Sequence, residues 1–116
     1  MHDEIGILPI WICPIAPARP GTHHPLYPLR EGVPYVNFGF WDRVRSREAK
    51  PPGELNRRIE RRVSALGGIK SLYSDSYFTE EEFWRIYDRR AYRRLKEIYD
   101  PADNLPDLYA KCVLRH

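Results

Sequence analysis

The chain has few cysteines and no long apolar run. These absences argue against a disulfide-rich or zinc-binding protein and against a membrane-spanning one. Its two cysteines, Cys13 and Cys112, lie far apart and have no second pair of metal ligands nearby, so neither a zinc site nor a disulfide framework is expected. The most apolar stretch, ILPIWICPIA, is broken by Pro9 and Pro14 and is shorter than the roughly 18 to 20 apolar residues of a membrane span. The first residues lack the basic start and the cleavage site of a secretory signal. These features favour a reduced, cytoplasmic setting. They are also compatible with peripheral contact with a membrane.

Short catalytic motifs are also missing. The sequence contains no Walker loop, no G-x-G-x-x-G, no H-E-x-x-H and no G-x-S-x-G. His23 and His24 are neighbours in a proline-rich loop, where adjacent residues do not easily chelate one ion, so no metal is expected. The net charge is only +3, from 19 basic and 16 acidic residues, and we expect no nucleic-acid partner. Arg58 and Arg62, one turn apart on a helix, leave a phosphate-contacting face as an alternative.

The patterns that are present predict an α+β fold. A chain of 116 residues has room for one domain, and its 11 prolines, concentrated before residue 53, predict an irregular first half. Three stretches read as strands: GILPIWICPI, PYVNFGFW and IKSLYSDSYF. We therefore expect an antiparallel sheet of about three strands, backed by helices and followed by a helical C-terminal segment.

Helices are expected in the second half. Leu55, Ile59, Val63 and Leu66 form an apolar stripe that ends at GG, and the opposite face carries four arginines with Glu54 and Glu60. Thr79 and Glu82 predict a capping box for a second helix, whose 3.6-residue period continues to Tyr99. After DPADNLPD, a last short helix is expected to carry Leu105, Leu108, Tyr109, Cys112 and Val113.

Strand alternation divides the aromatic residues between two faces of the predicted sheet. Val36, Phe38 and Phe40 are expected on a core face, and Tyr35, Asn37, Gly39 and Trp41 on the other. In the third predicted strand, Tyr73, Asp75 and Tyr77 share a face. We expect Trp11, Tyr35 and Asn37 to project from that same face of the sheet. Two interpretations are possible. These residues form either a polar site on an apolar surface or an aromatic core whose hydroxyl groups are hydrogen-bonded at its edge. The residue pattern leaves both open.

Four stretches, in order, resemble the C-terminal region of FAD-dependent oxidoreductases of the vanillyl-alcohol oxidase superfamily. They are LPIWICPI, YVNFGFW, GGIKSLYSDSYFTEEEFWRIYD and LPDLYAKCVLRH. They are similar to the branch of sterol reductases that act on a C24 side-chain double bond. That branch has a P-x-W-x-C-P strand, a Y-V-x-x-G strand, an L-Y-x-D-x-Y segment, an E-E-F-W helix and an R-H terminus. The resemblance runs from about residue 8 to the end.

This resemblance implies that the chain is part of a larger enzyme that is not active without its other part. In such enzymes FAD is bound mainly by a separate domain, while the cap covers the isoalloxazine ring and shapes the pocket for a small hydrophobic or alcohol substrate. Residues 1–95 would form part of the cap, and residues 96–116 would pack toward the FAD-binding domain. Hydride transfer to or from the flavin is the implied reaction. A non-enzymatic interaction domain that uses the aromatic sheet face is the alternative.

The same resemblance suggests catalytic residues. Tyr73 matches a tyrosine that lies beside the flavin in related sugar oxidases with an L-Y-x-x-K segment, and Ser76 stands where those have lysine. That departure agrees with the sterol-like branch. We expect Tyr73 to donate a proton, with Tyr77 or Asp75 orienting it.

Residues that face the substrate or the flavin are also suggested by the resemblance. Tyr35 and Asn37 match a strand that lines the substrate side of the ring, and Trp11 matches the neighbouring strand. Ser76 is added to this set from its place in the L-Y segment.

Overall fold

The chain divides into two compact units. The structure is a computed structural model that describes residues 6–44 and 49–116. One unit comprises Met1–His23 and Leu29–Leu55, and the other comprises His24–Pro28 and Asn56–His116. No helix in the described residues is long and apolar enough to cross a membrane.

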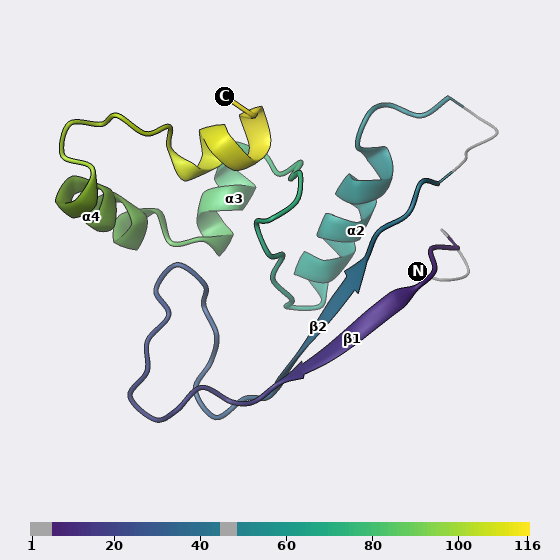
Figure 1. The fold of residues 1–116 in the computed structure, drawn as a ribbon, viewed down its shortest axis with the longest axis horizontal. Coiled ribbons are helices and arrows are strands. Elements are labelled where there is room, and N and C mark those ends of the chain that lie inside the picture. The colour runs from purple at the N-terminus through teal and green to yellow at the C-terminus, as the bar shows by residue number, and fades with distance from the viewer. Residues whose placement is uncertain (1–5, 45–48) are drawn as a thin grey trace. The chain divides into compact units, whose positions relative to one another are not determined.

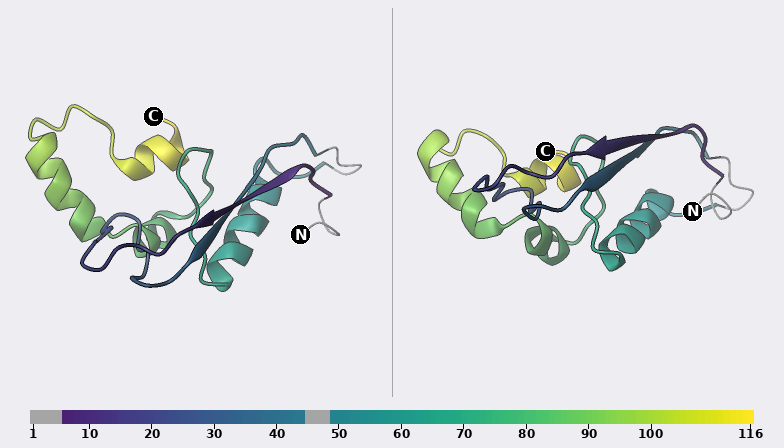
Figure 2. Two further views of the ribbon diagram at one scale, coloured as in Figure 1. Left: turned by 60° about the horizontal axis from the view of Figure 1, so that its bottom comes forward. Right: turned by 90° about the horizontal axis from the view of Figure 1, so that it is seen from below.

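The first unit contains a two-stranded antiparallel sheet. Strand β1 spans Ile10–Ile15 and β2 spans Tyr35–Phe40, and they stay side by side in every view (Figures 1 and 2). Both strands were predicted, with slightly wider bounds. β1 begins directly after Pro9, which lacks the N–H that a ladder needs.

The register of this sheet fixes which side chains share a face. Ile10 is opposite Phe40, Ile12 opposite Phe38 and Pro14 opposite Val36, so six apolar side chains lie on one face. The expectation that this face is core is wrong for the described chain, because Val36 is 50% exposed and Phe38 58%. The physical reason is that no further layer of the described unit covers these two strands. On the other face, Trp11 is opposite Gly39, and an added Cβ at Gly39 would meet the Trp11 indole.

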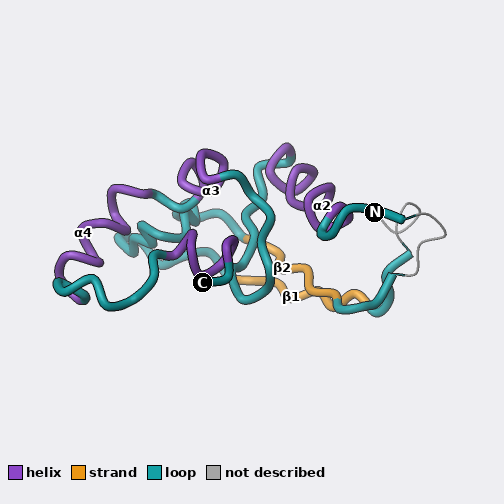
Figure 3. The backbone as a smooth tube through the Cα atoms, turned by 90° about the horizontal axis from the view of Figure 1, so that it is seen from above, coloured by secondary structure: helices purple, strands orange, loops and turns teal. Residues whose placement is uncertain are grey.

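The third predicted strand is absent from the described chain. Residues 69–78 form a loop between α2 and α3, which Figure 3 draws without a strand. The fold is therefore α+β with two strands rather than about three. The backbone of this loop forms its hydrogen bonds with side chains and with the C-terminal segment, as shown below for Ser76 and Tyr77.

The second unit is mainly helical. Its elements are α2 (Glu54–Ala65, of which the first two residues belong to the other unit), α3 (Glu80–Ile86), α4 (Arg89–Tyr99) and the π-helical turn η1 (Ala110–Leu114). The predicted capping box of α3 is confirmed: Glu82 N–H donates to Thr79 Oγ1, and Thr79 N–H donates to Glu82 Oε2. α2 ends as expected at glycine, where Gly67 has φ 73° and Gly68 N–H donates to the Val63 carbonyl.

The long helix predicted to reach Tyr99 is two helices. α3 ends at Ile86, with Tyr87 as its C-cap, and Asp88, with φ 20°, caps α4 by accepting from Ala91 N–H at 3.0 Å. The side chains before this break form the core: Phe83 and Tyr87 are fully buried, and Phe78 nearly so. Phe83 contacts Trp84, Tyr87 and Tyr109, with ring centroids 4.7–5.4 Å apart.

The end of α4 is held by a charged cluster. Lys96 Nζ lies 2.5 Å from Asp100 Oδ2 and 2.7 Å from Asp103 Oδ1, and it donates to the Leu105 carbonyl. Its ammonium group and the backbone N–H groups of Leu105 and Asn104 lower the pKa of Asp100 to about 2. This cluster fixes the DPADNLPD turn that leads to η1.

Candidate functional site

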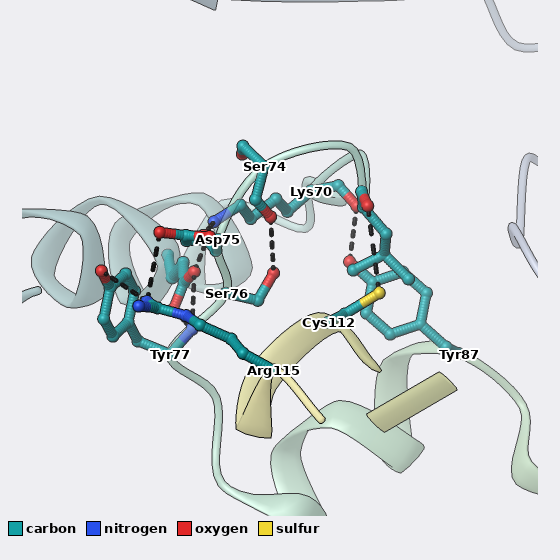
Figure 4. Close-up of polar contacts among 10 residues, drawn as sticks. Lys70, Ser74, Asp75, Ser76, Tyr77, Tyr87, Cys112 and Arg115 are labelled. Carbon is teal, nitrogen blue, oxygen red and sulfur yellow. Dashed lines mark hydrogen bonds and ion pairs between the residues drawn. The ribbon is translucent and has the colours of Figure 1, made fainter. Parts of the chain in front are cut away.

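A buried carboxylate organises the loop of residues 69–78. Glu60 on α2 is 3% exposed, and its Oε1 accepts from Lys70 Nζ at 2.6 Å. Both Glu60 oxygens also lie 3.1 Å from the Tyr77 backbone nitrogen, whose N–H they accept. Lys70 donates further to the Asp75 carbonyl at 2.5 Å (Figure 4). The expectation that Glu60 belongs to the solvated face of α2 is therefore wrong. The charge is tolerated in the interior because a cation and a backbone donor satisfy it.

The C-terminal segment holds two of the predicted catalytic residues together. Arg115 Nη2 lies 3.2 Å from Asp75 Oδ2 and donates to the Tyr77 hydroxyl at 3.0 Å (Figure 4). The guanidinium carbon is also 5.4 Å from the centroid of the Tyr77 ring, within the range of a cation–π contact. Asp75 and Tyr77 are thus brought together, through Arg115.

Tyr73 lies apart from that pair. Its side chain is 74% exposed, and its hydroxyl forms none of the hydrogen bonds in the described part of the chain. Strand alternation, on which the shared face of Tyr73, Asp75 and Tyr77 was predicted, does not apply to a loop. Tyr73 therefore presents an open phenol, while Asp75 and Tyr77 are already engaged.

Ser76 occupies the interior of the loop. It is 1% exposed, its N–H donates to the Cys112 carbonyl at 3.2 Å, and its hydroxyl donates to the Ser74 carbonyl at 3.5 Å. The Cys112 thiol in turn donates to the Leu72 carbonyl at 3.9 Å (Figure 4). Ser76 thus joins the loop to the C-terminal segment, and its predicted role beside a flavin stays a prediction.

Two side chains outside the loop contact its carbonyls, and burial raises the pKa of both. The Tyr87 hydroxyl donates to the Lys70 carbonyl at 2.5 Å, and burial raises the pKa of Tyr87. Burial likewise raises the pKa of the Cys112 thiol, which disfavours the nucleophilic thiolate. Both side chains act here as structural donors.

The strand residues of the candidate site lie in the other unit. Trp11, Tyr35 and Asn37 share one face of the sheet, as predicted. The Tyr35 hydroxyl accepts from Arg30 N–H at 2.8 Å, and this bond, with the nearby Arg30 charge, lowers the pKa of Tyr35. The Asn37 amide takes no part in the hydrogen bonds of the described residues and remains open to a ligand.

Sequence reasoning missed Glu60 and Arg115 as site residues. A signal existed for Glu60, because it lies three residues before Val63 and so borders the apolar stripe of α2. Arg115 was noted only within the R-H terminus, and nothing in the sequence pairs it with a residue 38 positions earlier.

Comparison with known proteins finds relatives over almost the whole chain. The chain is 35% identical over 113 residues to the Delta(24)-sterol reductases of Homo sapiens and Mus musculus, and 31% identical to the Delta(24)-sterol reductase homolog of Caenorhabditis elegans. Each match covers 95% of this chain and 21% of the relative. The resemblance to a C-terminal portion of the sterol reductase branch is thereby confirmed.

Two other comparisons found nothing. No family model matches the chain, and no solved structure matches it.

Proposed function

We propose that the chain is the C-terminal substrate-cap portion of an FAD-linked oxidoreductase that reduces a side-chain double bond of a sterol-like substrate. The observation that carries this proposal is the similarity, over 113 residues, to proteins named Delta(24)-sterol reductases. Because the chain spans about a fifth of those relatives, the flavin-binding domain would be supplied by the rest of the enzyme. Oxidation of an alcohol is the other reaction that the superfamily resemblance allows.

The exposed strand face supports the idea of a larger enzyme. Ile12 is 61% exposed and Phe38 58%, although both belong to an entirely apolar face of the sheet. A two-stranded sheet alone is only marginally stable in water, and an apolar face of this kind usually marks an interface. We infer that another part of the same enzyme covers it.

The residues present are chemically suited to a flavin and an apolar substrate. Trp11 and Tyr35 offer aromatic surfaces, and the open Asn37 amide offers both a donor and an acceptor. These residues would contact the ring or the substrate beside it. FAD, when bound, supplies the hydride that an alkene accepts, or takes the hydride that an alcohol gives up.

We assign to Tyr73 the role of donating the proton that completes reduction of the double bond. In alkene reduction one carbon accepts a hydride and its neighbour accepts a proton, so a donor must lie at the substrate. Tyr73 is exposed and has no hydrogen-bond partner among the described residues, which leaves its hydroxyl free for this task. Arg115 keeps Asp75 and Tyr77 fixed two and four residues further along the same loop.

Complementation tests the proposal. The part of the Homo sapiens Delta(24)-sterol reductase outside the matched region is expressed alone and together with this chain, and the flavin absorbance of each product is measured. We expect the complex to retain flavin and the reduced flavin to be reoxidised when a sterol with a Δ24 double bond is added. The part expressed alone should show no such dependence on sterol.

The alternative function has its own outcome in this experiment. A folded, stoichiometric complex in which sterol has no effect on the flavin would contradict the proposal. It would favour a non-enzymatic interaction domain.

A further inference from the structure

The second unit contains a cleft whose arginines have no role in the flavoenzyme proposal. Its volume is about 550 Å³, and it is lined by α2, by the Gly67–Gly68 turn, by both ends of the loop of residues 69–78, by α3 and by Pro28. On α2 the lining residues are Arg57, Glu60, Arg61 and Ser64, which follow one face of the helix at helical spacing. On α3 they include Glu82 and Arg85.

The carboxylates of this cleft already have partners. Glu60 is held by Lys70 and by Tyr77 N–H. Glu82 accepts from Thr79 N–H at 2.8 Å as part of the capping box. Arg85 is similarly engaged, because its Nη2 lies 2.7 Å from Glu81 Oε1.

Arg57 and Arg61 are different. Neither forms a hydrogen bond or an ion pair in the part of the chain that the structure describes, although their charges, after the capping bond to Thr79, help to lower the pKa of Glu82. Each guanidinium carries five N–H donors in a planar fork. Two such groups one helical turn apart, at a cleft whose carboxylates are engaged, leave an excess of unused donors and of positive charge.

We propose that this cleft binds the phosphate or diphosphate group of a small ligand, held by Arg57 and Arg61. A planar guanidinium fork matches the geometry of phosphate oxygens and forms short, charge-assisted hydrogen bonds with them. The Ser64 hydroxyl lines the same cleft and adds a neutral donor. Gly67 and Gly68 carry no side chain, so a bulky anion can approach the backbone of this turn.

The geometry favours a small anion over a nucleic acid. Arg58 and Arg62, the pair that the sequence suggested for nucleic-acid contact, are exposed and do not line the cleft. A nucleic acid would use an extended positive surface, whereas Arg57 and Arg61 act within one limited volume. The site is independent of the flavin proposal, so either can fail without the other.

Calorimetric titration of the full chain with inorganic pyrophosphate, and separately with orthophosphate, tests this site. We expect saturable binding that weakens as salt is raised, and a loss of at least tenfold in affinity in the double variant Arg57→Gln, Arg61→Gln. The variant Arg57→Lys, Arg61→Lys keeps the charge but loses the fork, and we expect an intermediate affinity. If the glutamine variant does not fold, the affinity of the lysine variant still tests whether the guanidinium groups bind the anion.

The matched control is Arg93→Gln, Arg94→Gln, which removes the same two charges from exposed positions of α4. It should change the affinity less than twofold. Absence of saturable binding would overturn the proposal, as would an equal loss in the control. Binding of an oligonucleotide that depends on Arg57 and Arg61, without binding of pyrophosphate, would also overturn it.

Discussion

Lys70 Nζ lies 2.6 Å from Glu60 Oε1, and this ion pair ties the loop of residues 69–78 to α2. The same carboxylate receives Tyr77 N–H, so one side chain positions both ends of the segment that contains Tyr73. The position of the candidate site therefore depends on Glu60, a buried residue of α2 that contacts the loop.

Replacing Glu60 by glutamine should destabilise this unit. The amide keeps the size of the side chain but leaves the Lys70 ammonium, which is 19% exposed, without its counter-charge. We expect a loss of about 2 kcal/mol in the free energy of unfolding, measured by urea denaturation. The control Glu81→Gln removes an 85% exposed carboxylate and should change stability by less than about 0.5 kcal/mol. Equal effects of the two variants would contradict the role given to Glu60.

Removing the Arg115 side chain should loosen the loop without unfolding the unit. Arg115→Ala releases Asp75 and the Tyr77 hydroxyl, but both partners are partly exposed, so the cost is expected to stay below about 1 kcal/mol. Hydrogen exchange should show faster opening at the Ser76 amide and no change at the amides of α4. Arg85→Ala, whose partner Glu81 lies outside the loop, serves as the control. Unchanged exchange at Ser76 would refute this role.

Acid should weaken the turn after α4 through Asp100. The pKa of Asp100 is lowered from 3.8 to about 2 in the folded chain, so its carboxylate stabilises the fold above its ordinary pKa. That stability is lost as pH falls from about 4 to about 2, because the unfolded chain binds the proton first. We expect the unfolding free energy of Asp100→Asn to depend less on pH in this window than that of the unaltered chain. Glu97→Gln, on the exposed side of α4, is the control, and parallel curves for all three proteins would disprove the assignment.

Gly39→Ala should disturb the sheet through Trp11. A Cβ at this position would lie 1.7 Å from Trp11 Nε1, so the indole must leave the strand surface. Amide exchange in β1 and β2 should report an opening free energy lower by about 1 kcal/mol. In a Trp11→Ala background the same substitution should have almost no effect. An equal cost in both backgrounds would show that the indole is not the reason for the glycine.

Local patterns in the sequence predicted the two strands and the start of α3. Alternation placed β1 and β2, and Thr79 with Glu82 placed the start of α3. The loop of residues 69–78 alternates as a strand does, but its N–H groups bond to Glu60 and to the Cys112 carbonyl. Alternation alone does not distinguish such bonds, to a side chain and to a single carbonyl, from the ladder of a paired strand.

The break between α3 and α4 was missed for a related reason. The apolar period continues through Tyr87, whose hydroxyl bonds to the Lys70 carbonyl 17 residues earlier. For Glu60 the sequence held only its position beside the apolar stripe of α2. That signal was overridden because a carboxylate among arginines is typical of a solvated surface.

The most direct test replaces the matched region of the Homo sapiens Delta(24)-sterol reductase by this chain and measures reduction of the sterol side-chain double bond. We expect the chimera to retain flavin and to form the reduced sterol. Tyr73→Phe should lower the rate at least tenfold while leaving flavin content and stability unchanged, because the lost hydroxyl is exposed and unpartnered in the described chain. Tyr99→Phe, at an 81% exposed tyrosine, should leave the rate unchanged. A folded, flavin-loaded chimera that forms no reduced sterol, or whose rate does not change in Tyr73→Phe, would contradict the account.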